Sequence, residues 1–309
     1  MPANDLQEIT QVLLKGDRSA LARSITLIES QRDEDRAASS VLLDACSEVA
    51  VRLHRRAPRI AITGAPGVGK STLINRLGLK WISEGHKVAV LAVDPSSRRT
   101  GGSLLGDKTR MGDLAQHPDA FIRPSPTSGH LGGVASATRE GSLLCEAAGF
   151  DVVIIETVGV GQSEDAVRDM VDVVIFVTMT DSGDELQGIK RGILEGVDVV
   201  VVNKADGDHL KAAQRFAGQL DQALHLLRGA DHPAVLCASA IEDRGIAEIV
   251  RHVETSLSNL EESGELSAQR DRQRLSWFGS ATRQLLNRHV DSIPTWKEER
   301  LRLNQAVLE

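Results

Sequence analysis

The sequence predicts an α/β protein with a mostly parallel sheet and helical extensions at both ends. Between residues 58 and 257, short runs rich in Val and Ile alternate with stretches of helical spacing. A glycine-rich segment, GAPGVGKS at 64–71, directly follows the first of these runs. Continuous apolar strands joined by helix-length connections indicate a parallel sheet covered on both faces. We therefore expect a helical N-terminal domain at 1–57, the α/β core at 58–257 and a helical C-terminal arm at 258–309.

Helical patterns account for both ends of the chain. Residues 4–54 contain three stretches with apolar residues at helical spacing, and Pro58 ends this pattern. In the C-terminal arm, one helical face collects Leu275, Phe278, Thr282, Leu285, Leu286, His289, Val290 and Ile293. Such a face is typical either of a helix packed back on its own core or of an arm that joins a second copy or another partner.

Six apolar runs supply the expected strands of the core. In chain order they are RIAIT (59–63), KVAVLAVD (87–94), DVVIIET (151–157), VVIFVT (173–178), DVVVVNK (198–204) and AVLCAS (234–239). In a parallel sheet of this kind, the loops that bind ligands gather at the carboxyl ends of the strands. The glycine-rich segment at 64–71 lies at such an end.

The composition narrows the class of protein. The 309 residues include 36 basic and 43 acidic side chains, and this net charge of −7 argues against a general binder of nucleic acid or of membrane surfaces. No apolar run approaches the length of a membrane span, and the N-terminus has no signal-like apolar segment. The three cysteines are far apart and form no C-x-x-C pair, so we expect reduced thiols in a cytoplasmic protein.

The segment at 64–71 fits the phosphate-binding pattern G-x-x-x-x-G-K-[ST]. Small residues allow consecutive backbone N–H groups to surround an anion at the positive end of the following helix. Lys70 is then expected to reach the β- and γ-phosphates, and the Ser71 hydroxyl to bind Mg²⁺. The predicted phosphate-binding residues are Gly64, Pro66, Gly67, Val68, Gly69, Lys70, Ser71 and Thr72.

A second motif selects the base. Asn203, Lys204 and Asp206 stand at the end of an apolar run in the spacing N-K-x-D. A carboxylate at Asp206 can accept hydrogen bonds from guanine N1–H and its 2-amino group, whereas adenine offers no donor there and would leave the carboxylate unpaired. At the next strand end, Ser239 is expected to support this loop and the Ala240 amide to meet guanine O6.

Acidic residues near the strand ends are candidates for holding the metal ion and its water. Asp94 ends one run, and Glu156 lies near the end of another, three residues before Gly159. Mg²⁺ prefers oxygen ligands, so these carboxylates can act directly or through water. Asp107, in a glycine-rich charged segment, is a further candidate, with a turn or helix-capping role as the alternative. The predicted catalytic set is Lys70, Asp94, Asp107 and Glu156.

These motifs together resemble the MeaB-like (ArgK/MMAA) family of P-loop GTPases. The resemblance rests on GAPGVGKST, DPSSRRTGGSLLGDKTRM, ETVGVGQSE, GDELQGIK and NKAD in this order, and it covers nearly the whole chain. It implies a GTP-hydrolysing chaperone that gates adenosylcobalamin loading of an acyl-CoA mutase of the methylmalonyl-CoA type and protects that mutase from inactivation. It also implies a homodimer joined through C-terminal helices, with adenosylcobalamin reached only through the mutase.

By the same resemblance, residues 183–192 form a switch that faces a protein partner. Asp184, Glu185, Gln187 and Lys190 are its candidate contact residues. Thr180 and Asp181 precede this segment where close relatives would have a Pro-Gly-like turn, so the partner preference can differ. The stretch 123–140 matches the family, but no chemical role follows from its residues.

Other functions stay open at this point. The same family includes proteins described as arginine/ornithine transport ATPases or kinases, and related GTPases insert nickel or zinc. A nucleotide-gated scaffold with negligible turnover is a third possibility. Since no Gln or Arg stands out as a water-orienting or charge-neutralising residue, we expect slow intrinsic hydrolysis that a partner accelerates.

Overall fold

The core of the protein is a parallel sheet of seven strands. The computed structural model describes residues 3–30, 32–53, 55–94, 111–126, 131–157, 167–180, 196–229 and 232–293, and 295–296, 299–300, 302–303 and 305 beyond them. Within these residues the strand order is β3-β2-β4-β1-β5-β6-β7, and every pairing is parallel. The strands are β1 (Arg59–Thr63), β2 (Val88–Asp94), β3 (Ala120–Pro126), β4 (Val152–Glu156), β5 (Val173–Thr178), β6 (Val199–Val202) and β7 (Ala234–Cys237). The predicted α/β class with a parallel sheet is confirmed.

The strands are apolar because helices cover both faces of the sheet. Every residue of β1, β4, β5 and β6 is buried. Successive side chains of a strand point to opposite faces. Accordingly Ile60 and Ile62 belong to one hydrophobic cluster and Ala61 to the other. The alternation places two aliphatic cores on the two sides of one sheet.

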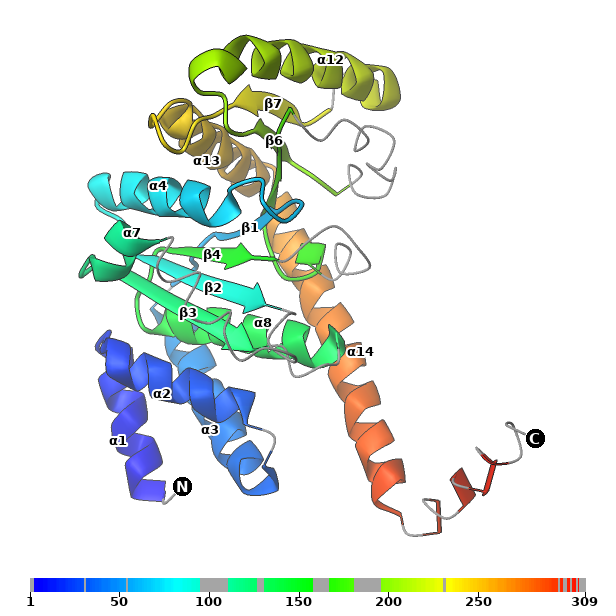
Figure 1. Ribbon diagram of the computed structural model, residues 1–309. Helices are drawn as coiled ribbons and strands as arrows, with labels where there is room; N and C mark the ends of the chain where they lie inside the picture. The colour runs from blue at the N-terminus through cyan, green and yellow to red at the C-terminus, as the bar shows by residue number, and fades with distance from the viewer. Residues whose placement is uncertain are drawn as a thin grey trace.

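In the part of the chain that the structure describes, helices lie over both faces of the sheet (Figure 1). The cluster on one face includes side chains from α4 (Lys70–Ser83), α7 (Gly112–Gln116) and α13 (Ile246–Glu262). The cluster on the other includes side chains from α8 (Leu131–Ala147) and α12 (Leu210–Arg228). The N-terminal helices α1 (Ala3–Leu14), α2 (Arg18–Glu29) and α3 (Asp33–Arg52) add to this second cluster beside α8, at the β3 edge of the molecule.

Strand β3 is the element that the sequence analysis missed. It lies at the edge of the sheet and pairs only with β2, with Ala92 opposite Pro124 and Asp94 opposite Pro126. Proline has no backbone N–H to donate to a neighbouring strand, so a run with two prolines is not readily predicted as a strand. An edge strand tolerates them because one side of its backbone needs no partner.

The C-terminal helix α14 (Glu265–Ser292) is bound to the core over its first turns. The side chain of Arg270 donates to both carboxylate oxygens of Asp172, at 2.8 and 2.6 Å, and Asp172 is fully buried just before β5. The amides of Gln269 and Gln273 donate to the Val171 carbonyl at 2.9 and 2.7 Å. Further along, the guanidinium of Arg139 on α8 lies over the Trp277 ring, 4.7 Å from its centroid.

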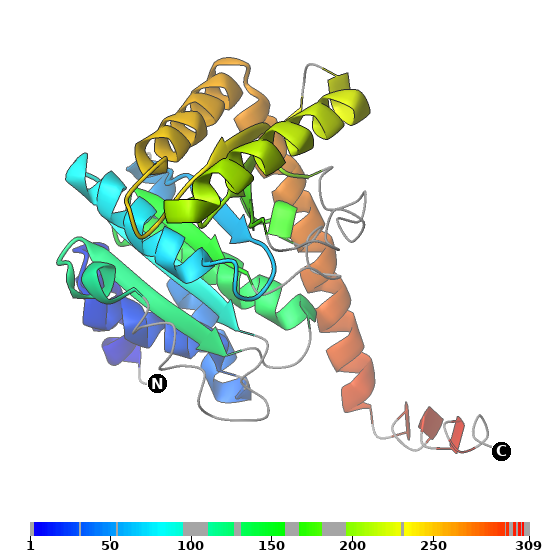
Figure 2. The same ribbon diagram turned by 45° about the horizontal axis from the view of Figure 1, so that its top comes forward.

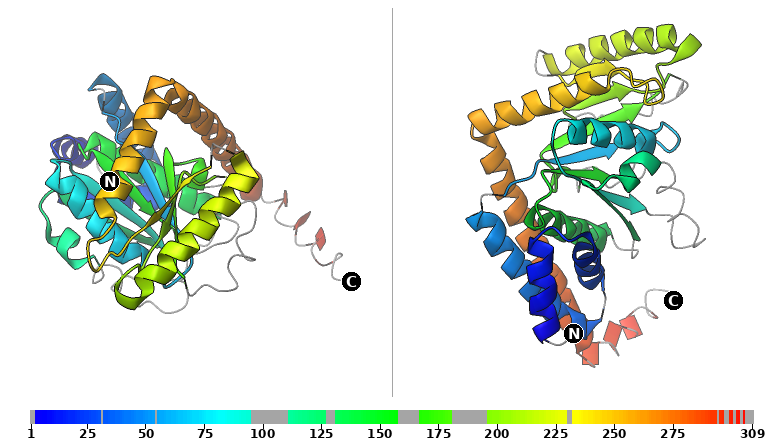
Figure 3. Two further views of the ribbon diagram at one scale, coloured as in Figure 1. Left: turned by 90° about the horizontal axis from the view of Figure 1, so that it is seen from above. Right: turned by 90° about the vertical axis from the view of Figure 1, so that its left-hand side faces the viewer.

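Beyond these contacts α14 leaves the body of the protein, as three views show (Figures 1–3). The expected domain boundary at 257/258 lies within α13, which ends at Glu262, and α14 begins at Glu265 after Ser263 and Gly264. Along α14 beyond Trp277, Phe278, Leu285 and Leu286 are 65, 61 and 60% exposed. The helix therefore packs on its own core at one end and presents an apolar face at the other.

Cys46, Cys145 and Cys237 are free cysteines in the structure. Cys46 and Cys145 lie in the hydrophobic core, and burial raises the pKa of the Cys46 thiol to about 11. In the part of the chain that the structure describes, no helix is both long and apolar enough to span a membrane.

Candidate nucleotide-binding site

The phosphate loop connects the carboxyl end of β1 to the start of α4. Its glycines adopt backbone angles that other residues rarely take: φ is +143° at Gly64, +86° at Gly67 and +92° at Gly69. A Cβ at Gly64 would lie 2.1 Å from the Val177 carbonyl oxygen on the neighbouring strand β5. The close approach of loop and strand therefore requires glycine at this position.

Lys70 lies at the first position of α4 and folds over the loop. Its Nζ donates to the carbonyl oxygens of Gly64 at 2.7 Å and Ala65 at 3.1 Å, and the residue is buried. The ammonium group is thus held above the same backbone whose N–H groups precede the helix. An ammonium and a helix N-terminus together favour an anionic ligand such as a phosphate chain.

Ser71 and Glu156 meet at the next position. The Ser71 hydroxyl donates to Glu156 Oε1 at 2.8 Å, and both residues are buried. Strands β4 and β1 are neighbours with Glu156 opposite Ile62, which brings the end of β4 to the phosphate loop. A hydroxyl beside a carboxylate supplies oxygen ligands of the kind that Mg²⁺ prefers, so these two residues fit that ion.

Asp94 and Asp107 are the other acidic residues predicted to hold the metal ion. Asp94 is the last residue of β2, one strand farther from β1 than Glu156. Asp107 and the predicted switch residues Asp184, Glu185, Gln187 and Lys190 lie outside the described residues.

Asn203, at the end of β6, joins the base-reading motif to the phosphate loop. Its Nδ2 donates to the Val68 carbonyl at 2.8 Å. A Cβ on Gly69 would lie 2.7 Å from the same nitrogen. Glycine is therefore required at position 69 both by its positive φ and by the space that the Asn203 amide occupies.

Asp206 and Ser239 meet at the ends of adjacent strands. The Ser239 hydroxyl donates to Asp206 Oδ2 at 2.9 Å, and the Ala205 N–H donates to the Ala238 carbonyl at 2.9 Å. Lys204, between Asn203 and Ala205, has φ of +59° and an exposed side chain. The structure therefore brings together the two segments that the sequence analysis assigned to guanine.

Three residues at this site were not predicted. Arg76 on α4 donates from Nε to the Ala240 carbonyl at 3.0 Å. Arg244 donates from Nη1 to the Ala205 carbonyl at 3.2 Å and forms an ion pair with Glu242 at 2.7 Å. The charged triplet EDR at 242–244, close to Ser239 and Ala240 in the sequence, is the signal that could have indicated Glu242 and Arg244, whereas Arg76 on α4 has no such signal.

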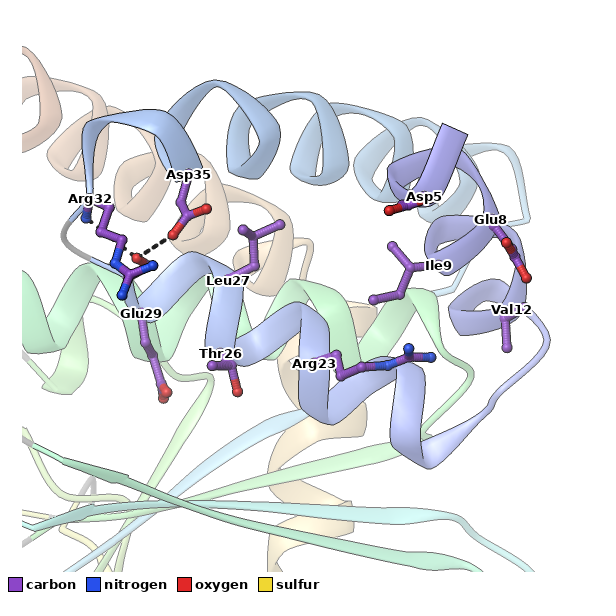
Figure 4. A pocket seen from close by; sticks show the side chains of 11 residues that line it. Asp5, Glu8, Ile9, Val12, Arg23, Thr26, Leu27, Glu29, Arg32 and Asp35 are labelled. Atoms are coloured by element: carbon purple, nitrogen blue, oxygen red, sulfur yellow. Dashed lines mark hydrogen bonds between the residues drawn. The ribbon is translucent and has the colours of Figure 1, made fainter. Parts of the chain in front are cut away.

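A separate cavity of ≈ 760 Å³ lies among the N-terminal helices (Figure 4). Ile9 and Val12 of α1 and Leu27 of α2 contribute apolar surface, and Arg23 of α2 and the acidic residues Asp5 and Glu8 of α1 also line it. None of its lining residues belongs to the phosphate loop or the base-reading segments. The cavity is therefore distinct from the nucleotide-binding site.

The fold and the site define a class of protein. A parallel α/β sheet with a phosphate loop after its first strand, a hydroxyl beside an acidic strand end and an N-K-x-D segment has the parts of a P-loop GTPase. Residues 21–295 match the family model described as "Methylmalonyl Co-A mutase-associated GTPase MeaB". The chain belongs to this MeaB family, as its motifs predicted.

Individual relatives agree with the family model. A probable GTPase of Mycobacterium tuberculosis is 52% identical over 295 residues, covering 94% of this chain and 87% of the relative. The mouse protein named methylmalonic aciduria type A homolog, mitochondrial, is 43% identical over 305 residues, covering 96% and 74%. A solved structure described as an LAO/AO transport system kinase is 38% identical, with a TM-score of 0.79 and coverage of 99% and 93%.

Proposed function

We propose that this GTPase gates the loading of adenosylcobalamin into an acyl-CoA mutase of the methylmalonyl-CoA type and protects that mutase from inactivation. The observation that supports this role most is the family match, because the model that covers residues 21–295 is described by its association with methylmalonyl-CoA mutase. The name of the mouse relative points to the same metabolic step. In this role the protein acts in the cytoplasm and reaches the cobalamin cofactor only through the mutase.

Each part of the nucleotide site has a proposed task. Lys70 neutralises charge on the β- and γ-phosphates, while the loop residues 64–72 donate their N–H groups. Ser71 and Glu156 would hold Mg²⁺, with Asp94 and Asp107 acting directly or through water. When bound, the ion neutralises negative charge on the phosphate oxygens. Asp206 reads the guanine N1–H and 2-amino group, and the Ala240 amide meets O6.

Base recognition has a direct test. Replacing Asp206 by Asn removes the acceptor for the guanine 2-amino group and introduces an amide that can donate to the 2-oxo group of xanthine. The Asp206→Asn protein should therefore bind GDP more weakly and xanthosine diphosphate more tightly than the wild type, as titration calorimetry would measure. An unchanged ratio of the two affinities rejects this assignment.

The mutase role is tested by coupling between the two proteins. GTP turnover is measured alone and with saturating methylmalonyl-, isobutyryl- or 2-hydroxyisobutyryl-CoA mutase, and the true partner should raise it. Replacing Lys190 by Ala should leave the basal rate near wild type and reduce the stimulated rate. Since coupling is reciprocal for binding free energies, the same change should weaken the effect of nucleotide on mutase affinity. Failure of all three mutases to bind or stimulate contradicts the proposal.

Two other functions remain as alternatives. The solved relative described as a transport system kinase favours an ATP-dependent enzyme associated with arginine or ornithine transport. Parallel GTP and ATP titrations separate it from the proposed role, because adenine has no donor for Asp206. A nickel- or zinc-insertion GTPase would require a metal-binding cluster. In the part of the chain that the structure covers, no group of three or more His, Cys, Asp or Glu side chains could hold a metal ion.

A further inference from the structure

The loop that contains Asp206 is held from both sides by one charged pair. Arg244 Nη1 donates to the carbonyl of Ala205, directly before Asp206, at 3.2 Å. Glu242 Oε1 accepts from the N–H of Gly207, directly after Asp206, at 3.3 Å. The two side chains also form an ion pair with each other, Nη2 to Oε2, at 2.7 Å. The pair therefore brackets the backbone of Asp206.

The segment that supplies this pair is closed on itself. Ser239 and Arg244 exchange two backbone hydrogen bonds, each 3.0 Å long. The Ser239 hydroxyl accepts the Glu242 N–H at 3.1 Å and donates to Asp206 Oδ2 at 2.9 Å. Because a hydroxyl has a single proton, the bond from Glu242 favours a hydroxyl rotamer with that proton directed at Asp206.

Backbone strain is concentrated in the same place. Among the described residues, the non-glycine residues with positive φ are Lys204, at +59°, and Asp243, at +58°. Left-handed backbone costs a residue with a Cβ about 1 kcal/mol, and such conformations persist where surrounding contacts over-determine them. Lys204 lies in the segment that contains Asp206, and Asp243 lies in the segment that supplies Glu242 and Arg244. The Arg244–Glu242 pair connects these two segments.

A second arginine ties these segments to the phosphate-binding helix. Arg76 Nε donates to the carbonyl of Ala240 at 3.0 Å. Arg76 lies on α4, the helix that begins with Lys70 and Ser71. The residue expected to meet guanine O6 is thus held by the helix whose first turn meets the phosphates.

We propose that Arg244, Glu242 and Arg76 are positioning residues for base selection: they set where Asp206 and Ala240 stand relative to the phosphate loop. The proposal rests on the proposed guanine-reading role of Asp206 and adds the residues that make this reading selective. Such residues need not touch the nucleotide. Their loss is expected to relax discrimination between bases without impairing the phosphate site.

The experiment compares Arg244→Met with the wild type, using GDP, inosine diphosphate and inorganic pyrophosphate as probes. Inosine lacks the 2-amino group, so the GDP-to-IDP affinity ratio reports how well Asp206 is placed. Methionine keeps most of the side-chain volume and removes the donors. We expect GDP affinity and the GDP-to-IDP ratio each to fall about tenfold, in the range of a lost hydrogen bond to a charged group. Pyrophosphate affinity should stay within about twofold.

Kinetics supply a second readout. The KM for GTP should rise about tenfold for Arg244→Met, while kcat at saturating GTP stays within about twofold, because ground-state base contacts are lost and the phosphate groups are not. Arg251→Met, the same substitution at an exposed position of α13, is the matched control and should change neither value. Glu242→Gln keeps an acceptor for Gly207 and should fall between wild type and Arg244→Met.

The outcomes distinguish a failure of the base-reading role of Asp206 from a failure of the positioning role of Arg244. If Asp206→Asn leaves the ratio of guanine to xanthine affinity unchanged, the base-reading role itself is wrong. If Asp206→Asn changes that ratio while Arg244→Met, folded by circular dichroism, keeps the wild-type GDP-to-IDP ratio, the positioning role is wrong. If Arg244→Met does not fold, Glu242→Gln and Arg76→Met decide by the same ratio.

Discussion

Lys70 is buried, and its ammonium group lies over the phosphate loop, so replacing Lys70 tests the assignment of this loop. Its ammonium group donates to two carbonyls of the phosphate loop and would lie beside the phosphates of bound GTP. Lys70→Ala should lower GTP turnover at least about a hundredfold, the usual effect of removing a preorganised charge or donor that faces developing charge. Phosphate release measures it, and Lys80→Ala in the last turn of α4, at the far end of the helix from the phosphate loop, is the control. Unchanged turnover in a folded Lys70→Ala protein contradicts the phosphate-loop assignment.

Gly64 is required by space as well as by backbone angle. An added Cβ would lie 2.1 Å from the Val177 carbonyl oxygen, a backbone atom that cannot rotate away. Gly64→Ala should therefore lower the free energy of unfolding by about 3 kcal/mol. Urea denaturation measures the change. Gly218→Ala is the matched control: Gly218 is exposed within α12, with no atom within 4 Å of an added Cβ, and alanine there should add about 0.5–1 kcal/mol.

The predictability of a site residue depends on how local its geometry is. The phosphate loop was predictable because strand, turn and helix start are consecutive, and glycine spacing records the backbone angles directly. The pairing of Ser71 with Glu156 spans 85 residues, and the sequence could indicate only that both stand at the same edge of a sheet. Arg244 contacts Ala205 across 39 residues, and no spacing rule encodes that contact.

At the scale of elements, composition separated strands from helices wherever the strand is buried. The six apolar runs became β1, β2 and β4–β7. Of these, β1, β2 and β4–β6 are central strands, which are apolar on both faces, whereas β7 lies at the other edge of the sheet and is only partly buried. β3 was not predicted because its prolines, Pro124 and Pro126, are acceptable only in an edge strand. Whether a strand lies at an edge depends on the whole sheet and cannot be seen in the sequence of the strand itself.

Among the contacts that attach α14 to the core is one buried charge pair, Asp172 with Arg270. Burial alone would lower the pKa of Arg270, but the hydrogen bonds and charge of Asp172 raise it. Asp172 also accepts from the Arg59 N–H at 2.8 Å, so the carboxylate links β1, β5 and α14. Asp172→Ala would leave the Arg270 guanidinium without its counter-charge and should cost about 3–5 kcal/mol of unfolding free energy.

Urea denaturation tests this prediction against a pair on the same helix. Asp271 pairs with Arg274 at the surface, where both side chains are more than half exposed. Exposed pairs contribute at most about 1 kcal/mol, so Asp271→Ala should leave the urea midpoint nearly unchanged. A loss of similar size in both variants would mean that the Asp172–Arg270 pair has no special role.

The whole molecule is a compact α/β body with one helix that reaches beyond it (Figures 1 and 3). Beyond its attachment to the core, α14 and the residue that follows it expose large apolar side chains: Leu275, Trp277, Phe278, Leu285, Leu286, Val290 and Ile293. Contiguous apolar surface on a soluble protein marks an interaction site. The resemblance to the MeaB family implies that a second copy covers it, so the expected form is a homodimer.

Charged substitutions on this face should therefore separate the copies. Burying a carboxylate without a partner costs several kcal/mol, so the double change Leu285→Glu with Leu286→Glu should convert a dimer to a monomer at micromolar concentration. Light scattering after size exclusion measures the mass. The control is Leu226→Glu on α12, which is 86% exposed and lies outside α14, and it should leave the mass unchanged. A wild-type monomer, or a double variant that stays dimeric, would mean that α14 does not join two copies. In either case the mutase would be the remaining candidate partner for the apolar face of α14. Mutase binding to the same double variant would then show whether the mutase contacts this face.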